Sequence, residues 1–490
     1  MRRACHLLVL LTPLLLCASV CLSSPVISDL FGRDASVGGL TLPDWEGYMA
    51  NPTIELVITP PAGAEMPVKV TILGNDPRLC FDLPSEAGPE GPKKELTLSG
   101  PDQQSIFVAV FPARQKHPAQ AMLAASFVDA RGRRGVIRVP IRIVPIESHD
   151  PSPTYPITVD FSQDRTGFFN NPVHRSTFEQ AVRDWAYYLA DMHTDPVAAG
   201  AEKTSIFEPE GFARSHIVTN ARPYTGYLMY AYGIHGQEKR AGGEPSGAGK
   251  WQTIDGKPLD VRRSGGVEVD IRGNYNTIGW MPPIPDQQWW RATNLGDVQM
   301  DLYSIVHHEM GHALFFNPSN RRFPRNGVLK DDAVREYLGS EARTDVHDHL
   351  DGIIDPWSLH GGFGNEYHGK FPYGRWLITR LDLLCARAVG YKLRRTAPFI
   401  PLSIRTGKLA DAVHWKPYDA PLAAEGGIPF YDWTISQGEL PPGMALNRIT
   451  GAITGTPRKV GRFAFTVMLR DYQRNAQGIS RGFVINVSGR

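Results

Sequence analysis

The chain has 490 residues, of which 42% are hydrophobic, and its 52 Lys and Arg against 50 Asp and Glu give a net charge of +2. This length predicts several domains with ample apolar cores. The balanced charge, without long runs of one sign, argues against nucleic acid as a partner and gives no reason to expect an anionic membrane surface.

The N-terminus has the pattern of an export signal. Arg2 and Arg3 precede an apolar stretch over 7–22, and small residues follow at Ser23 and Ser24. We predict a signal peptide over 1–23 and a secreted protein. The apolar stretch is short for a membrane span and no later stretch is longer, so we expect no integral span after cleavage; an uncleaved anchor is the alternative.

The next part of the chain predicts a β-sandwich. Residues 24–44 have little periodicity and are interpreted as a linker. Short strand-like runs separated by Pro/Gly-rich breaks then predict an N-terminal β-sandwich over 45–147. These runs cover residues 54–59, 67–72, 105–110 and 136–144.

Residues 148–403 contain both helix-like and strand-like spacing of apolar residues, which predicts an α+β domain. Strands are expected at 157–161, 227–232 and 267–271. A helix is expected to open with a capping box at Ser176–Glu179. Another is expected over 375–389, closed by Gly390.

The main chemical signal is His308-Glu-Met-Gly-His312, an HExxH element in a run with helical spacing of apolar residues. Asn294 or Asp297 could cap this helix, and Asn317-Pro318 could end it. Two histidines four positions apart lie on one helix face, where both can bind one metal ion. This is the zincin arrangement, in which Zn²⁺ activates water and the glutamate, here Glu309, is the general base.

A catalytic zinc needs a third protein ligand. Phe315 and Pro318 exclude the compact metzincin pattern, in which a third histidine follows closely. The segments 333–339 and 345–350 resemble those of leishmanolysin-type, long-insert metzincins, and the resemblance implies His349 as third ligand and zinc-peptidase activity. Unlike metzincins, the chain has no Met between Met310 and Met444 for a methionine turn.

The sequence leaves alternative candidates for the third ligand and for the residue that orients a ligand histidine. The remaining candidates for the third ligand are His347, His360, His368, Glu336 and Glu341. Asp345 or Asp348 could accept a hydrogen bond from a ligand imidazole, although each could equally be a solvated loop acid. His307 lies about 100° around the helix from His308, so we expect it to pack or face solvent.

Residues 404–490 return to a β pattern. The text LPPGMALNRITGAITGTP, followed by GRFAFTVMLRD, closely resembles the "putative Ig" repeat of bacterial surface and secreted proteins over about 415–488. The resemblance implies an immunoglobulin-like sandwich after a short linker.

Together these features predict a multidomain protein with an α+β zincin, metzincin-like domain between an N-terminal β-sandwich and a C-terminal Ig-like β-sandwich. The expected function is a secreted zinc-dependent endopeptidase acting on protein or peptide substrates, with Glu309 as general base and His308, His312 and His349 as metal ligands. The alternative is an exported surface adhesion or binding protein with an inactive metallopeptidase-like domain. Either could contact a cell surface or carbohydrate through its Ig-like modules.

Overall fold

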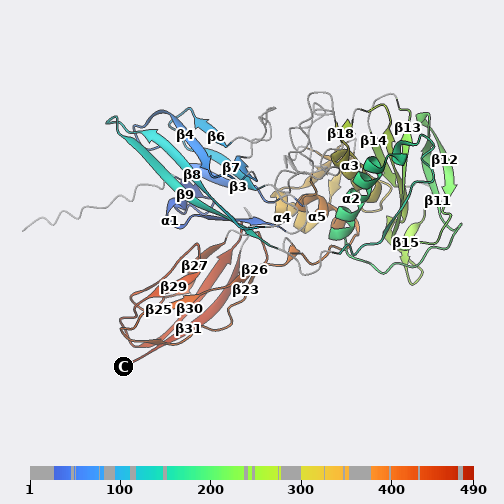
Figure 1. Ribbon diagram of the computed structural model, residues 1–490. Coiled ribbons are helices and arrows are strands. Elements are labelled where there is room, and N and C mark those ends of the chain that lie inside the picture. Colours follow the sequence, from blue (N-terminus) through green and yellow to red (C-terminus); the bar gives the residue numbers. More distant parts are fainter. Residues whose placement is uncertain are drawn as a thin grey trace, which may run out of the picture.

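The chain forms a multidomain, mostly β protein with several sheets and a few helices (Figure 1). The computed structural model describes residues 27–45, 49, 51–76, 78–81, 94–110, 117–146, 152–236, 241–245, 249–273, 275–276, 300–324, 326–345, 348–351, 377–396, 399–428, 431–472 and 478–489. The predicted signal peptide, residues 1–23, lies outside these ranges. Among the described helices, none combines the length and apolar character needed to cross a bilayer.

The N-terminal part is a sandwich of two sheets around one apolar core. One sheet has the order β1 (Ile27–Asp29), β3 (Ile54–Ile58), β7 (Gln104–Val110), β5 (Leu79–Phe81). The other has the order β2 (Leu40–Asp44), β9 (Arg134–Pro145), β8 (Ala119–Val128), β4 (Glu65–Leu73), β6 (Glu95–Leu98). The four predicted strand runs are confirmed as β3, β4, β7 and β9.

The predicted linker over 24–44 is wrong for residues 27–44, which belong to the sandwich. β1 pairs with β3, and β2 pairs in parallel with β9, about a hundred residues later. Asp34 caps a short helix between them, α1 (Ala35–Gly38). Ile27, Leu40 and Leu42 are buried in the core. Strands of three and five residues are too short to give a clear alternation, and their partners lie far along the chain.

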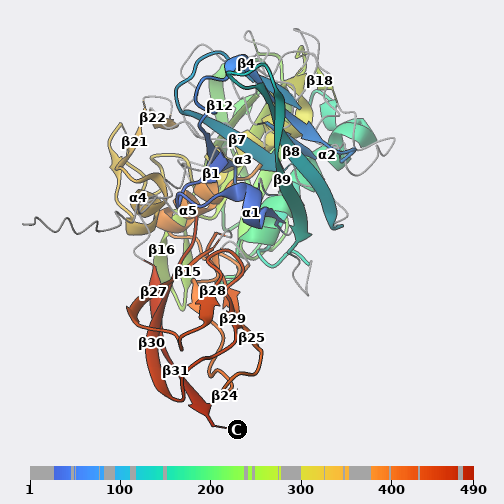
Figure 2. The same cartoon turned by 90° about the vertical axis from the view of Figure 1, so that its left-hand side faces the viewer.

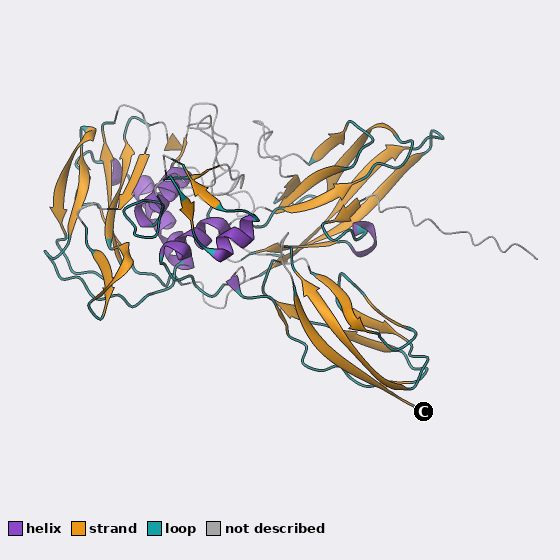
Figure 3. Cartoon of the chain, turned by 180° about the vertical axis from the view of Figure 1, so that it is seen from behind, coloured by secondary structure: helices purple, strands orange, loops and turns teal. Residues whose placement is uncertain are grey.

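The middle part is built on a mixed sheet. β10 (Ile157–Asp160), β13 (Tyr227–Ile234) and β17 (Ser264–Asp270) run parallel, and β14 (Ala241–Pro245) is antiparallel to β17 at the edge. Every residue of β13 and β17 is buried because both sheet faces are covered. α2 (Pro172–Tyr188) and α3 (Leu302–Leu314) contact the sheet on one side, and the hairpin of β11 (Lys203–Glu208) and β12 (Gly211–Thr219) contacts it too. Figure 3 shows the long helices gathered in this part.

Two predicted helix boundaries have different outcomes. α2 begins at Pro172, with Asn171 as N-cap, so the predicted N-cap at Ser176 is five residues late. The Ser176 hydroxyl instead donates to the carbonyl of Val173 within the helix. The helix predicted over 375–389 is confirmed at its C-terminal end, where Gly390 ends α5 (Arg380–Val389) with a φ of 134°. Its predicted start is too early, because Thr379 is the N-cap and forms a reciprocal capping box with Asp382; residues 375 and 376 lie outside the described residues.

Small elements lie beside and between these helices. They are η1 (Phe168–Asn170), β15 (Trp251–Ile254), β16 (Lys257–Arg262), β18 (Tyr275–Asn276), β19 (Met300–Asp301), β20 (Val328–Leu329), α4 (Asp332–Leu338), β21 (Ala342–Thr344) and β22 (Leu350–Asp351). The last three strands form one sheet in the order β20, β21, β22.

The C-terminal part is a second sandwich. One sheet has the order β24 (Ala412–Val413), β31 (Ile479–Ser488), β30 (Gly461–Arg470), β27 (Asp432–Gly438). The other has β25 (Tyr418–Pro421), β29 (Ala452–Gly455), β28 (Met444–Leu446), and a short pair joins β23 (Ser403–Ile404) to β26 (Ala424–Glu425). Trp433 and Ile453 are buried in its core.

A buried charged network joins the two sandwiches. Arg33 of the N-terminal sandwich donates to the carbonyls of Tyr431 and Arg448 and lies 3.6 Å from Asp432 in the C-terminal one. Asp432 is fully buried and also binds the guanidinium groups of Arg448 and Arg470. These contacts hold the two sandwiches against each other, although the middle part of the chain separates them in sequence (Figures 1 and 2).

Candidate metal centre

Helix α3 presents the HExxH residues from a buried position. Asp301 caps its first turn by accepting a hydrogen bond from the backbone N–H of Ser304 at 3.0 Å, whereas the predicted caps Asn294 and Asp297 lie outside the described residues. One face of the helix is packed into the core, including Val306 and Met310, which are fully buried. His308, Glu309 and His312 are only partly buried, so their side chains stay accessible for chemistry.

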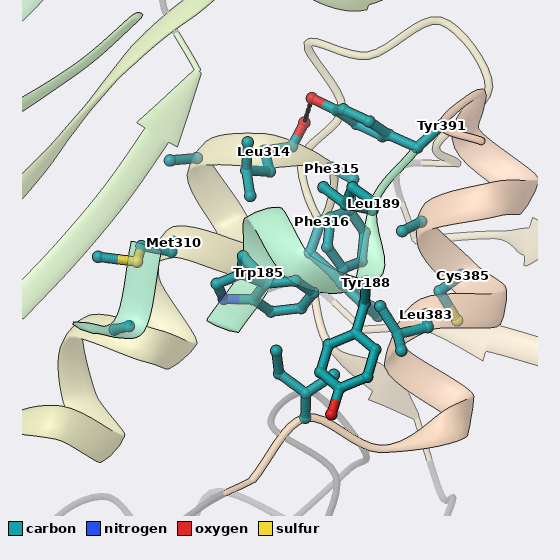
Figure 4. Close-up of a cluster of buried hydrophobic side chains, with 14 of the residues drawn as sticks. Trp185, Tyr188, Leu189, Met310, Leu314, Phe315, Phe316, Leu383, Cys385 and Tyr391 are labelled. Carbon is teal, nitrogen blue, oxygen red and sulfur yellow. Dashed lines mark hydrogen bonds between the residues drawn. The ribbon is translucent and has the colours of Figure 1, made fainter. Parts of the chain in front are cut away.

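The C-terminal end of α3 is held by side chains from other elements. The hydroxyl group of Tyr391 donates to the carbonyl of Leu314 (Figure 4). The hydroxyl group of Tyr227 donates to the carbonyl of Ala313, and the side-chain amide of Asn320 donates to the carbonyl of Leu314 at 3.2 Å. Carbonyls in the last turn have no partner within a helix, so these donors satisfy groups that would be costly to bury. Burial raises the pKa of both tyrosines well above the ordinary value, which keeps the donating protons in place.

α2 fixes the side of α3 next to the histidines. The indole N–H of Trp185 donates to the carbonyl of His307 at 3.0 Å. The His307 ring is buried and lies against the rings of Trp185 and Tyr303, with centroids 5.5 and 4.7 Å away. His307 is therefore a packing residue. Its position on the helix had predicted either packing or exposure to solvent.

A small hairpin brings His349 to the helix. β21 pairs antiparallel with β22, and His349 immediately precedes β22, where Leu350 is fully buried. The carboxylate of Asp345 accepts the backbone N–H of His349 at 2.9 Å, and Asp345 N–H donates to the His349 carbonyl at 2.8 Å. Asp348 has a φ of 63°, a value that aspartate tolerates better than most residues. These contacts fix the conformation of the loop that places His349 beside α3.

The three imidazoles meet at one point. The Nε2 atoms of His308, His312 and His349 lie 3.2 Å from one another in all three pairs. A tetrahedral zinc with bonds of roughly 2.0–2.1 Å places neighbouring ligand nitrogens about 3.3 Å apart. The three histidines thus form a group that could hold a metal ion.

The other ring nitrogens of the histidines also have suitable neighbours. Nδ1 of His312 lies 2.8 Å from the carbonyl of Phe316, so it carries the proton and leaves the Nε2 lone pair for a metal. Nδ1 of His349 lies 3.9 Å from the Asp345 carboxylate. Burial lowers the pKa of His312, against the opposing effects of the Phe316 carbonyl and the Asp345 charge. The neutral, metal-binding form is therefore favoured.

The predicted third ligand, His349, joins the two helix histidines. Glu336 and Glu341 are exposed and are not in the three-histidine group. His347, His360 and His368 lie outside the described residues. The Phe316 carbonyl and the tyrosines that hold α3 were not predicted. A backbone acceptor has no residue signature, and the tyrosines come from positions 227 and 391, far from the motif.

The comparisons identify one domain. Residues 408–488 match the family described as "Putative Ig domain". The C-terminal sandwich is an Ig-like domain. This confirms the prediction from the repeat, and the match covers that domain alone. No curated protein matches the chain.

Similar solved structures add no argument about function. A "putative alpha-galactosidase" from Bacteroides fragilis is 20% identical, with a TM-score of 0.16, over 18% of this chain and 17% of that one. A PapD-like domain of human CEP192 is 12% identical, with a TM-score of 0.18, over 30% of this chain and 99% of that one. Protocadherin Gamma B2 is 9% identical, with a TM-score of 0.16, over 95% and 77%. The chain therefore spans about a sixth of the first of these proteins.

Proposed function

We propose that the protein is a secreted zinc-dependent endopeptidase. The observation that carries the proposal is the triangle of Nε2 atoms from His308, His312 and His349, each 3.2 Å from the other two. Three protein ligands leave a fourth position for water or substrate, which is typical of catalytic and not structural zinc sites. When bound, zinc would polarise a carbonyl and lower the pKa of a water ligand to near neutrality.

Glu309 would be the general base. It follows His308 on α3, is partly buried, and is not one of the three histidines of the group. In this role the carboxylate takes a proton from the attacking water and gives it to the leaving amine. A site that only held a metal for structural reasons would not need this acid, which favours an enzyme.

The edge of the sheet supports a peptide substrate. β14 pairs with β17 on one side, and no other described strand pairs with it. α3 packs against β14, so this edge lies beside the helix that carries the histidines. An extended peptide could add to the edge through backbone hydrogen bonds, a recognition mode that is tolerant of side-chain sequence.

The experiment measures hydrolysis of an unfolded protein by the chain from Ser24 onwards. We expect activity that a chelator removes and added zinc restores. Glu309→Gln should abolish turnover while zinc remains bound, because the ligands are unchanged. Glu336→Gln, at an exposed glutamate of α4 outside the histidine group, is the matched control and should stay active. Equal activity of Glu309→Gln and the wild type would contradict the proposal.

The alternative is an exported adhesion or binding protein whose metal centre is inactive. The Ig-like domain is compatible with this role as well as with the enzyme. If the wild type binds zinc but hydrolyses none of several unfolded protein substrates, the result would favour the alternative.

A further inference from the structure

The free end of the Ig-like domain carries an exposed apolar and basic surface. We call it the distal surface; it consists of Val413, Trp415, Lys416, Arg458, Lys459 and Val460, all exposed. Trp415 is 53% exposed, and the two valines are 39% and 49% exposed. β24 and the C-terminus mark this end of the molecule, far from α2 and α3 (Figure 2).

Backbone hydrogen bonds hold the two segments of the distal surface together. Trp415 N–H donates to the carbonyl of Pro457 at 3.0 Å, next to Arg458. Lys416 N–H donates back to Val413, and His414 N–H donates to Ser488, each at 3.0 Å. The distal surface is therefore a built feature of the domain and not a loose loop.

Trp415 has a backbone conformation that a large residue rarely adopts. Its φ is 60°, in the left-handed region, where Asn, Asp or Gly is usual. Such a conformation has an energetic cost, and residues that bear it concentrate at binding sites. Burial of the side chain does not offset this energetic cost, since Trp415 is more than half exposed. The position therefore indicates a contact made outside the chain.

The two segments of the distal surface carry basic side chains. Residues 413–416 and 457–462 contain Lys416, Arg458, Lys459 and Arg462, and no Asp or Glu. Within the described part of the chain none of these four forms an ion pair. Two exposed acids, Asp411 and Asp419, lie four positions before and after Trp415. Asp411 accepts hydrogen bonds from the backbone and side chain of Asn486. Exposed cations beside an exposed indole favour an anionic, partly apolar partner.

We propose that the distal surface docks the protein on an anionic phospholipid membrane. Tryptophan favours the membrane interface, and exposed valines can enter its apolar boundary. Lysine and arginine are attracted to anionic headgroups. An anionic polysaccharide is a weaker fit, because the valines offer no hydrogen bond and the distal surface has no carboxylate or amide for sugar hydroxyls. This proposal does not depend on the proposed catalysis. The balanced overall charge gave no reason to expect a membrane partner, whereas the distal surface is a local feature that favours one.

The test measures partition of the chain from Ser24 onwards onto vesicles by cosedimentation. The vesicles are phosphatidylcholine alone or phosphatidylcholine mixed with phosphatidylglycerol. We expect binding to the mixed vesicles only, weakened by salt. Arg458→Gln with Lys459→Gln should lower the partition constant about 30-fold, since each basic residue contributes about 1 kcal/mol near an anionic surface. Trp415→Asn should also lower it without loss of folding stability, because Asn suits a φ of 60°.

Arg134→Gln with Arg138→Gln is the matched control. These exposed arginines flank Val136, which is 42% exposed, on β9 of the N-terminal sandwich. They should leave partition unchanged. An equal loss from the control pair, no loss from Trp415→Asn, or no preference for anionic vesicles would overturn the inference. So would binding of dextran sulfate through Trp415 by a protein that does not bind the vesicles.

Discussion

Replacement of Arg33 by methionine tests whether the N-terminal sandwich is a fixed part of the molecule. Methionine keeps an apolar stem of similar length and removes the guanidinium. That group is 6% exposed, binds Asp29, and lies 2.8 Å from the Arg448 carbonyl and 3.6 Å from Asp432. Its loss would leave buried acceptors in both sandwiches with fewer donors.

The expected cost is about 3 kcal/mol in the free energy of unfolding. Removing one partner of a buried ion pair typically costs about 3–5 kcal/mol. The lower end applies because Asp432 keeps Arg448 and Arg470, and Asp29 keeps the backbone N–H groups of Phe31 and Arg33. The assay is urea unfolding, supported by calorimetry, in which separate transitions for the two sandwiches should become resolved.

Arg133→Met is a close control. Arg133 pairs with Asp129, again four residues earlier, and Asp129 accepts the backbone N–H groups of Arg131 and Arg133, at the same spacing as the two that Asp29 accepts. Here the arginine side chain is 70% exposed, so its replacement should have little effect. If the two variants were equally stable, the network would not join the domains, and the N-terminal sandwich could be a separable segment.

Further predictions concern the metal centre. Asp345→Asn removes a group that orients a ligand, so zinc affinity should fall about 10–100-fold. His349→Gln removes a ligand and should weaken zinc binding much more. Equilibrium competition with a chelator dye measures both affinities, and His193→Gln, at an exposed histidine, is the control. Zinc should be released as pH falls and the ligand histidines protonate, and the lowered pKa of His312, caused mainly by burial, delays protonation of that ligand to lower pH. Zinc titrations against pH measure this, and retention well below about pH 4 would contradict histidine ligation.

The metal helix was predictable because its signal is local. HExxH sets two ligands and an acid within one turn and a half, and the apolar spacing around it fixes which face is buried. The cap was not predicted, because Asp301 is one of several polar residues before the helix and only its hydrogen bond to Ser304 distinguishes it. His349 could be inferred only from the resemblance of the segment around it, because 36 residues separate it from His312.

Long-range pairing was the least predictable feature. The pairing of β2 with β9, and the contact of Arg33 with Asp432, join residues that are far apart in sequence. A short strand next to a Gly-rich turn looks like a linker when its partner is unknown. The Ig-like domain was predicted well for the opposite reason, since its repeat contains both the strand pattern and the turns between strands.

X-ray absorption of the zinc-loaded protein tests the metal centre most directly. We expect one zinc per chain with three imidazole nitrogens at about 2.0–2.1 Å and one further light ligand. His349→Gln should lose one imidazole, and Glu309→Gln should keep all three. A spectrum with two imidazoles in the wild type, or the same spectrum for the wild type and His349→Gln, would contradict the three-histidine site.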